Sequence, residues 1–249
     1  MSDQLLGTAA EQNDVPACES VKEEKKSSFF GRRKGKPLSP RQQALLDERL
    51  PSLLLDPNMP MNDVKSLFDE TKQAIWMEIG FGGAEHMSYQ AIQNPQVGLI
   101  GCEPFVNGVS KAIDQIAAHD IANIRLYNED AAHILDWLPV GSIDKLFLLY
   151  PDPWHKKRHW KRRFVSHHNL ERIIRVLKPG GIFRFASDIA DYVDWTLEHI
   201  KKHPQFKELG ATSEQRQQPY PDWKRTRYEA KAYREGRIPQ YLEFERLAD

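Results

Sequence analysis

The feature that most constrains the fold of this chain is a regular alternation of short apolar strands with helices, beginning at residue 74. Stretches rich in β-branched and aromatic residues predict buried strands over 74–79, 97–102, 124–127, 145–150 and 182–186. Helical patterns lie between them, from about residue 84, over 106–118 and over about 164–176. The sequence therefore predicts an α/β fold with a mostly parallel sheet covered on both faces, to which a late strand over 241–244 adds one or two edge strands.

The 249 residues have room for one substantial core, so we expect a single domain over residues 31–249 after a disordered acidic tail over 1–30. Residues 1–24 hold six of the 35 acids and one of the 35 bases, which leaves a net charge of +5 on the remainder. A basic segment follows at 31–36. Ser39-Pro40 is typical of a helix start, and we expect that helix to end before Pro51.

Several classes of protein are disfavoured by what the sequence lacks. No run reaches the roughly eighteen apolar residues of a membrane span, and residues 1–16 lack the pattern of a secretory signal. Cys18 and Cys102 fit neither a disulfide framework nor a metal site. We therefore expect a cytoplasmic protein without a metal.

A glycine turn follows the first predicted strand, at the end where ligands of open α/β sheets bind. Residues 78–84 read EIGFGGA, and Gly80 and Gly82 allow the backbone to approach a ligand closely. A tight turn between strand and helix also needs glycine for structural reasons alone. The dinucleotide fingerprint would need a further glycine where this chain has Glu85, whose carboxylate would repel a pyrophosphate.

Two acids follow the next two predicted strands. Glu103 can accept both hydroxyls of a ribose, and Asp130 can accept a hydrogen bond from an adenine amino group. Each acid alone is more often a solvated loop residue or a helix cap. Together with a glycine turn that lacks a phosphate cradle, they indicate an adenosine ligand without phosphate, of which S-adenosylmethionine is the common example.

The most informative stretch follows the fourth predicted strand. Asp152 lies between two prolines, which restrict the backbone and remove two amide donors. Six cations follow within residues 156–163, the basic run. A solvated helix start is the simplest interpretation, but the helix dipole repels cations there, so we favour contacts with a phosphate backbone. His155 and His159 have helical metal-ligand spacing, yet they lack a third ligand and are surrounded by cations.

Over roughly residues 30–247 the chain resembles the bacterial tRNA (guanine-N7-)-methyltransferases. The most specific match is PDPW at 151–154, followed by Lys156, Arg158, His159, Lys161, Arg162 and Arg163. Further matches are EIGFG at 78–82, Glu103-Pro104, Asp130-Ala131, FASD at 185–188 and TRYE at 226–229. The chain has Ala84 where the family often has glycine, and Arg227-Tyr228 in place of lysine-phenylalanine.

The resemblance implies a Rossmann-like, doubly wound class I methyltransferase fold with a mostly parallel seven-stranded sheet. It also implies methyl transfer from S-adenosylmethionine to N7 of guanosine 46 in the tRNA variable loop. The residues expected to bind the methyl donor are Glu78, Gly80, Gly82, Glu103, Asp130 and Asp152. Those expected to bind the substrate are Lys156, Asp188, Thr226, Arg227, Tyr228 and Glu229.

Guanine N7 has an exposed lone pair and no proton, so its methylation requires alignment rather than a strong base. We expect Asp152 to be the catalytic residue, which positions the reactants and stabilises the cation that develops on the purine. Asp188 and Glu229 are expected to read the base. The expected RNA patch comprises Arg158, His159, Lys161, Arg162 and Arg163.

Two alternatives remain open at this point: a methyltransferase of the same architecture acting on another RNA, such as rRNA, and a non-catalytic RNA-binding module. The acids at 78, 103, 130 and 152 favour the enzyme. For the oligomeric state we expect a monomer, with a homodimer as the alternative.

Overall fold

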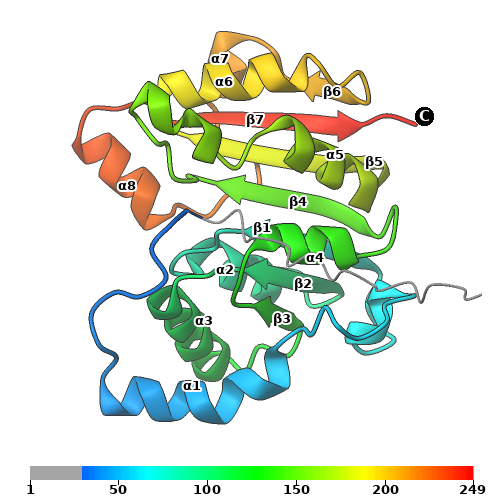
Figure 1. The fold of residues 1–249 in the computed structure, drawn as a ribbon, viewed down its shortest axis with the longest axis vertical. Helices are drawn as coiled ribbons and strands as arrows, with labels where there is room; N and C mark the ends of the chain where they lie inside the picture. Colours follow the sequence, from blue (N-terminus) through cyan, green and yellow to red (C-terminus); the bar gives the residue numbers. More distant parts are fainter. Residues whose placement is uncertain (1–29, 249) are drawn as a thin grey trace, which may run out of the picture.

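The computed structural model describes residues 30–248, which form one seven-stranded sheet flanked by helices (Figure 1). The strands lie in the order β3-β2-β1-β4-β5-β7-β6. Their bounds are Ala74–Ile79 (β1), Val97–Cys102 (β2), Ile124–Tyr127 (β3), Ile143–Leu149 (β4), Leu177–Ser187 (β5), Phe206–Leu209 (β6) and Gln240–Arg246 (β7). Strands β1 to β5 pair in parallel, and β7 is antiparallel to both of its neighbours. The predicted α/β class and the mostly parallel seven-stranded sheet are confirmed.

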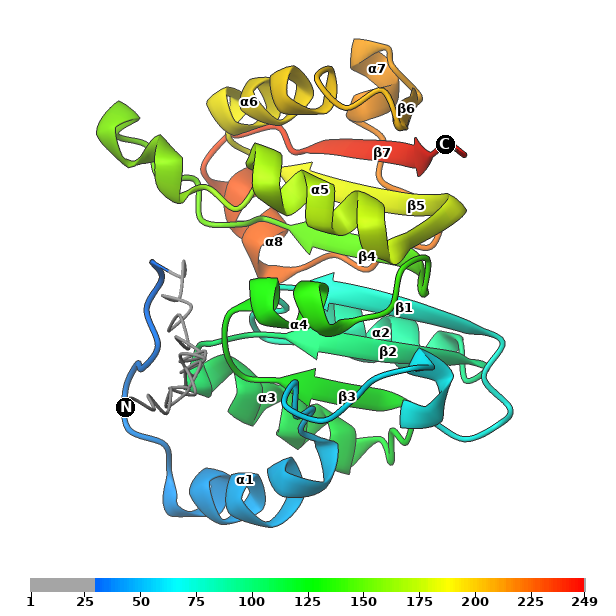
Figure 2. The same cartoon turned by 45° about the vertical axis from the view of Figure 1, so that its right-hand side comes forward.

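Helices cover both faces of the sheet (Figure 2). They are α1 (Pro40–Leu53), α2 (Glu85–Gln93), α3 (Val106–Ala118), α4 (Ala131–Trp137), α5 (His167–Val176), α6 (Ala190–Ile200), α7 (Ser213–Arg216) and α8 (Arg227–Arg234), with the 3-10 helices η1 (Val64–Leu67) and η2 (Lys157–Arg162). Side chains of a strand alternate between its two faces. One apolar core therefore joins Met77 of β1 to α4, α5 and α6, and a second core joins Leu99 of β2 to α1, α2 and α3.

Two local expectations are wrong. Helix α1 has the predicted start, with Ser39 as N-cap and Pro40 in the first turn, but it continues through Pro51. A proline in the last turn removes a single helical hydrogen bond, so it does not force the helix to end at that residue. The strand expected over 182–186 begins earlier, because β5 starts at Leu177 and includes residues 178–181, with an irregularity where the pairing with β4 shifts between Ile143 and Lys145.

The basic run is also arranged differently from the expectation. Residues 157–162 of the run form the separate 3-10 helix η2, and α5 begins only at His167, capped by the Ser166 hydroxyl. The cations therefore do not occupy the N-terminus of α5, and the argument from repulsion by the helix dipole does not apply to them.

The carboxyl ends of β1, β2 and β4 point to one edge of the sheet, on the left in Figure 1. Helix α8 and the chain that leads into α1 lie along the same edge. Apart from Phe30, the tail expected over residues 1–30 falls outside the described residues, so the division into tail and domain stays a prediction. Within residues 30–248, no helix is long and apolar enough to cross a membrane.

Candidate active site

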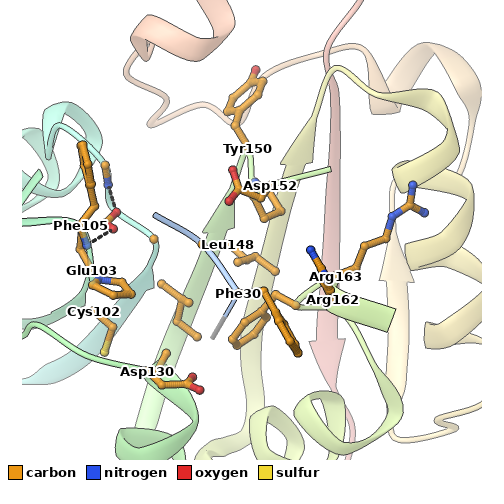
Figure 3. Close-up of a pocket in the computed structure, with 18 of the residues that line it drawn as sticks. Phe30, Cys102, Glu103, Phe105, Asp130, Leu148, Tyr150, Asp152, Arg162 and Arg163 are labelled. Atoms are coloured by element: carbon orange, nitrogen blue, oxygen red, sulfur yellow. Dashed lines mark hydrogen bonds between the residues drawn. The ribbon is translucent and has the colours of Figure 1, made fainter. Parts of the chain in front are cut away.

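A cavity of about 470 Å³ opens at this edge of the sheet, a size typical of small-molecule sites. Figure 3 shows its wall, to which segments far apart in the sequence contribute. They include the glycine turn after β1, the end of β2, the start of α4, the segment after β4, and residues 30–32, with further contributions from α3, η2, α5 and α8. Ligands of open α/β sheets bind at this place, so the cavity is the candidate donor site.

The glycine turn has left-handed backbone at three positions, with φ of 72° at Gly80, 55° at Gly82 and 63° at Ala84. The Gly80 amide donates to the Cys102 carbonyl at 2.7 Å, which joins the turn to the end of β2. A Cβ atom at Gly80 would meet nothing within 4 Å, whereas one at Gly108 would lie 2.4 Å from the Gly82 carbonyl oxygen. The turn is thus packed on α3 on one side and open toward the cavity on the other.

The buried Glu103 links β2 to the glycine turn. Its Oε2 accepts a hydrogen bond from the Gly82 amide at 2.8 Å, and its Oε1 accepts one from the Phe105 amide at 2.9 Å (Figure 3). Burial raises the pKa of Glu103, against the effect of these two bonds. The amides fix the orientation of the carboxylate, and each oxygen keeps a lone pair for a ligand hydroxyl.

Asp130 is both a helix cap and a residue of the cavity wall. Its Oδ1 accepts a hydrogen bond from the Ala132 amide at 3.0 Å, which caps α4. The same side chain borders the cavity on the side away from Asp152 (Figure 3). The structural and the functional interpretations of this acid are therefore compatible.

Asp152 lies in a segment with unusual backbone geometry. Tyr150 and Trp154, on either side of it, have φ of 51° and 47°, which non-glycine residues rarely adopt. The prolines at 151 and 153 restrict the segment further. Desolvation raises the pKa of Asp152. Strained backbone of this kind is concentrated at functional sites, where it orients a side chain.

Asp152 also joins the donor cavity to a second hollow, the outer hollow, which is lined by Asp152, Pro153, Trp154, His155, Lys156 and His159. Asp152 and Trp154 therefore both border the two spaces. Within residues 30–248, no three histidine, cysteine, aspartate or glutamate side chains are grouped to hold a metal ion.

The members of the basic run have different environments. Lys161 and Arg162 border the donor cavity, and the Arg162 guanidinium lies 4.9 Å from the ring centre of Trp154 and 5.3 Å from that of Phe30. Arg163 is buried, and its guanidinium donates to the carbonyls of Pro153 at 2.9 Å and Asp191 at 3.1 Å. Arg163, expected in the RNA patch, thus holds the Asp152 segment against α6 in this structure, and it also lines the donor cavity.

The segment 226–229 begins α8 and reaches the mouth of the cavity. Thr226 caps the helix, and Arg227 pairs with Glu85 at 3.0 Å, which compensates the charge of that carboxylate beside the glycine turn. Tyr228 is 46% exposed and stacks on Tyr150, with ring centres 6.4 Å apart and planes inclined by 19°. Arg227 and Tyr228 line the cavity.

Three of the expected carboxylates are not brought to the cavity wall. They are Glu78, whose Oε2 lies 2.6 Å from His86 Nδ1, Asp188, which accepts from Arg237 Nε at 2.5 Å, and Glu229, which accepts from Trp223 Nε1 at 2.6 Å and from the Tyr241 hydroxyl at 2.7 Å. Thr226 acts as a cap, and Arg158 borders neither space. In this conformation these side chains bind other parts of the protein.

The sequence interpretation missed residues 30–32 of the cavity wall, which it assigned to the tail and the start of a flexible basic segment. The reason for their position is a contact with α3. The Gly35 amide donates to Asn107 Oδ1 at 2.8 Å, and the Arg33 carbonyl accepts from the Val106 amide at 3.0 Å. A Cβ atom at Gly35 would lie 2.6 Å from Asn107 Oδ1. The glycine at this position was therefore the one feature of the sequence that could have indicated close packing of the backbone here against another element.

Comparisons with known proteins agree with this geometry. The family model described as a putative methyltransferase matches residues 72–240. A tRNA (guanine-N(7)-)-methyltransferase of Rhizobium meliloti (strain 1021) is 53% identical over 220 residues, which cover 88% of this chain and 95% of the relative. That of Nitrobacter hamburgensis is 48% identical over 243 residues, covering 97% of this chain and 94% of the relative.

Among solved structures, an rRNA methylase from Streptococcus thermophilus is similar with a TM-score of 0.49 and 13% identity, over 71% of this chain and 89% of that one. The match to the family model and the extent and identity of the matches to the curated relatives establish the family. The chain belongs to the tRNA (guanine-N7-)-methyltransferase family of S-adenosylmethionine-dependent enzymes.

Proposed function

We propose that this protein transfers a methyl group from S-adenosylmethionine to N7 of guanosine 46 in the variable loop of tRNA. The observation that carries the proposal is the position of Asp152, which borders both the donor cavity and the outer hollow beside the basic run. A carboxylate at that junction reaches the donor from one side and an RNA base from the other. The names of the relatives support tRNA and guanine N7 as the acceptor.

The residues of the donor cavity fit S-adenosylmethionine. Gly80 leaves open space beside the glycine turn, where a side chain would occupy the volume of the ligand. Glu103 is oriented to accept from ribose hydroxyls, and Asp130 from the adenine amino group. Acids rather than a cluster of amide donors suit an uncharged adenosine better than a phosphate.

When bound, S-adenosylmethionine supplies an electrophilic methyl group on a positively charged sulfur, which becomes a neutral thioether as the methyl carbon bonds to N7. The N7 lone pair forms the new bond, no proton moves, and the positive charge ends on the guanine ring. Asp152 stabilises that charge from a fixed position at the junction. Because the reaction needs alignment rather than a base, the rigid segment 150–154 accounts for much of the catalysis.

The acceptor side is assigned to residues that face solvent near this junction. Tyr228, stacked on Tyr150, offers an aromatic surface for an extruded base, and Lys156 and Lys161 offer cations to phosphate groups. Asp188 and Glu229 would read the base only after leaving their present partners. We place the protein with tRNA in the cytoplasm and expect it to act as a monomer, with a homodimer as the alternative.

The proposal is tested by methyl transfer from labelled S-adenosylmethionine to an unmodified tRNA transcript, followed by digestion to nucleosides. The expected product is 7-methylguanosine, absent when guanosine 46 is replaced by adenosine. Total RNA in the same assay distinguishes the alternatives: label in rRNA rather than tRNA would assign another substrate. Absence of both label and binding of S-adenosylhomocysteine would identify a non-catalytic module.

A further inference from the structure

A buried hydrogen bond spans the glycine turn. Glu78 lies near the end of β1, before the turn, and His86 lies in the first part of α2, after it. Both side chains are almost fully buried, and Glu78 Oε2 is 2.6 Å from His86 Nδ1. The bond therefore connects the two ends of the segment that contains Gly80, Gly82 and Ala84, with its three left-handed residues.

The surrounding groups determine which ring nitrogen of His86 carries the proton. The Gln90 side-chain nitrogen donates to the Asp222 carbonyl at 2.8 Å and lies 3.3 Å from His86 Nε2. Because an amide nitrogen has two protons and no lone pair to offer, Nε2 must be the acceptor of its second proton. The ring proton is then on Nδ1, which donates to Glu78.

The packing around His86 allows little movement of the ring. The His86 ring centre lies 4.8 Å from that of Phe147 and 5.3 Å from that of Trp223, and no member of this group lines the donor cavity. A buried ionisable side chain is expensive unless it is hydrogen-bonded, so the pair is strongly held to its geometry. It has no direct access to either reactant.

We propose that His86 is a positioning residue of the methyl-donor site, which acts through Glu78 to hold the glycine turn in its left-handed conformation. Holding the turn keeps the Gly82 amide on Glu103, and hence orients the carboxylate for the donor ribose. The inference rests on the proposed function. It gives Glu78 a role within the protein, because its Oε2 is bonded to His86 and the residue does not line the donor cavity in this structure.

The test compares three variants of the full-length chain. His86→Phe keeps a flat ring without the donor, His86→Asn places an amide donor close to the position of Nδ1, and Ser88→Ala is a control on the same helix. Ser88 is equally buried, and no hydrogen bond is made by its hydroxyl. Calorimetry with S-adenosylhomocysteine and steady-state kinetics with tRNA are measured for each.

For His86→Phe we expect the Kd for S-adenosylhomocysteine and the KM for S-adenosylmethionine to rise roughly tenfold or more, with the KM for tRNA unchanged. His86→Asn should restore most of the loss, and Ser88→Ala should behave as the wild type. Wild-type donor affinity in His86→Phe, or an equal loss in His86→Phe and His86→Asn, would overturn the inference.

A second measurement uses the unmodified protein, so it does not depend on the folding of a variant. Nitrogen-15 NMR of the histidine rings should show His86 with its proton on Nδ1; a proton on Nε2 alone would overturn the proposal. If the wild type failed to bind S-adenosylhomocysteine, the proposed function would be wrong, while the NMR result would still report on the pair.

Discussion

At the scale of single residues, Asp152 combines exposure to the junction with an environment that disfavours its charge. The neighbouring protein raises its pKa by desolvation. A carboxylate held this way is less well solvated than in water, so it interacts more strongly with a cation that develops beside it.

We predict that Asp152→Asn lowers kcat by roughly a hundredfold or more and leaves tRNA affinity unchanged. In the wild type, activity should fall as the pH drops through the raised pKa of Asp152, above the ordinary value of 3.8, because protonation removes the stabilising charge. That acidic limb should be absent from the residual rate of the variant. Normal turnover by Asp152→Asn would refute the catalytic assignment.

The same shift has a consequence for stability. A carboxyl group whose pKa is raised by folding destabilises the native state once the pH exceeds the value of the unfolded chain. Asp152→Asn should therefore melt at a higher temperature than the wild type at neutral pH, and this gain should disappear near pH 4 or below. The Asp152 carboxylate that serves the reaction therefore lowers the stability of the folded protein at neutral pH.

Single residues also show what the sequence could predict of the site. Glu103, Asp130 and Asp152 follow strands whose carboxyl ends meet at one edge, so strand boundaries alone place them at the cavity. Glu78 and Glu229 matched the family motifs equally well, but their partners are not visible in a linear pattern. Glu78 lies on the α2 face of β1, and Glu229 bonds to Tyr241, twelve residues further along the chain.

At the scale of elements, the basic run in and around η2 presents its cations unequally. Arg163 is directed into the protein and Arg162 lies between two aromatic rings, while Lys157, Arg158 and Lys161 are exposed. Counterion release depends on cations that reach phosphate groups, so these exposed members should carry the salt dependence of tRNA binding.

We predict that Arg158→Ala/Lys161→Ala weakens tRNA binding and lowers the slope of log affinity against log salt by about 1.5, since each lost phosphate contact accounts for about 0.7–0.9. Lys201→Ala/Lys202→Ala is the matched control, because these exposed lysines follow α6 and precede β6 at the opposite edge of the sheet. Titrations at several salt concentrations measure both. An unchanged slope in the Arg158→Ala/Lys161→Ala variant would show that these residues do not contact tRNA phosphates.

Elements with a strong hydrophobic period were predicted to within a few residues, as for β1, β2 and β3. The ends of helices and strands were predicted less well where the prediction depended on a proline or a glycine. Pro51 lies in a last helical turn where it removes one hydrogen bond, and the glycines at 180 and 181 lie within β5, which was predicted to begin only at residue 182. Such residues limit the local conformation without specifying it, and packing decides between the allowed states.

At the scale of the whole molecule, the first described residues and the last helix, α8, help to enclose the donor cavity. Phe30 belongs to the first described residues, and Tyr228 to the last helix. Phe30 could not be placed there from the sequence, because its position depends on a long-range contact of the neighbouring Gly35 with Asn107 of α3. Tyr228 was expected at the site from its motif, but its stacking on Tyr150 is a long-range contact that the motif does not show. The parallel sheet alone provides only the floor of the site.

The backbone of residues 150–154 also determines which of the two molecules must deform when enzyme and RNA meet. A segment with two left-handed residues and two prolines is too restricted to reach a base that is stacked inside the RNA. The base must therefore be extruded from the stack to reach the site. A transcript whose tertiary partner of guanosine 46 is replaced, leaving that guanosine unpaired, should show kcat/KM raised by roughly tenfold at similar Kd. An equal or lower kcat/KM at unchanged Kd would mean that extrusion of the base does not limit the reaction. The segment 150–154 would then change its conformation to reach the base, despite its two prolines.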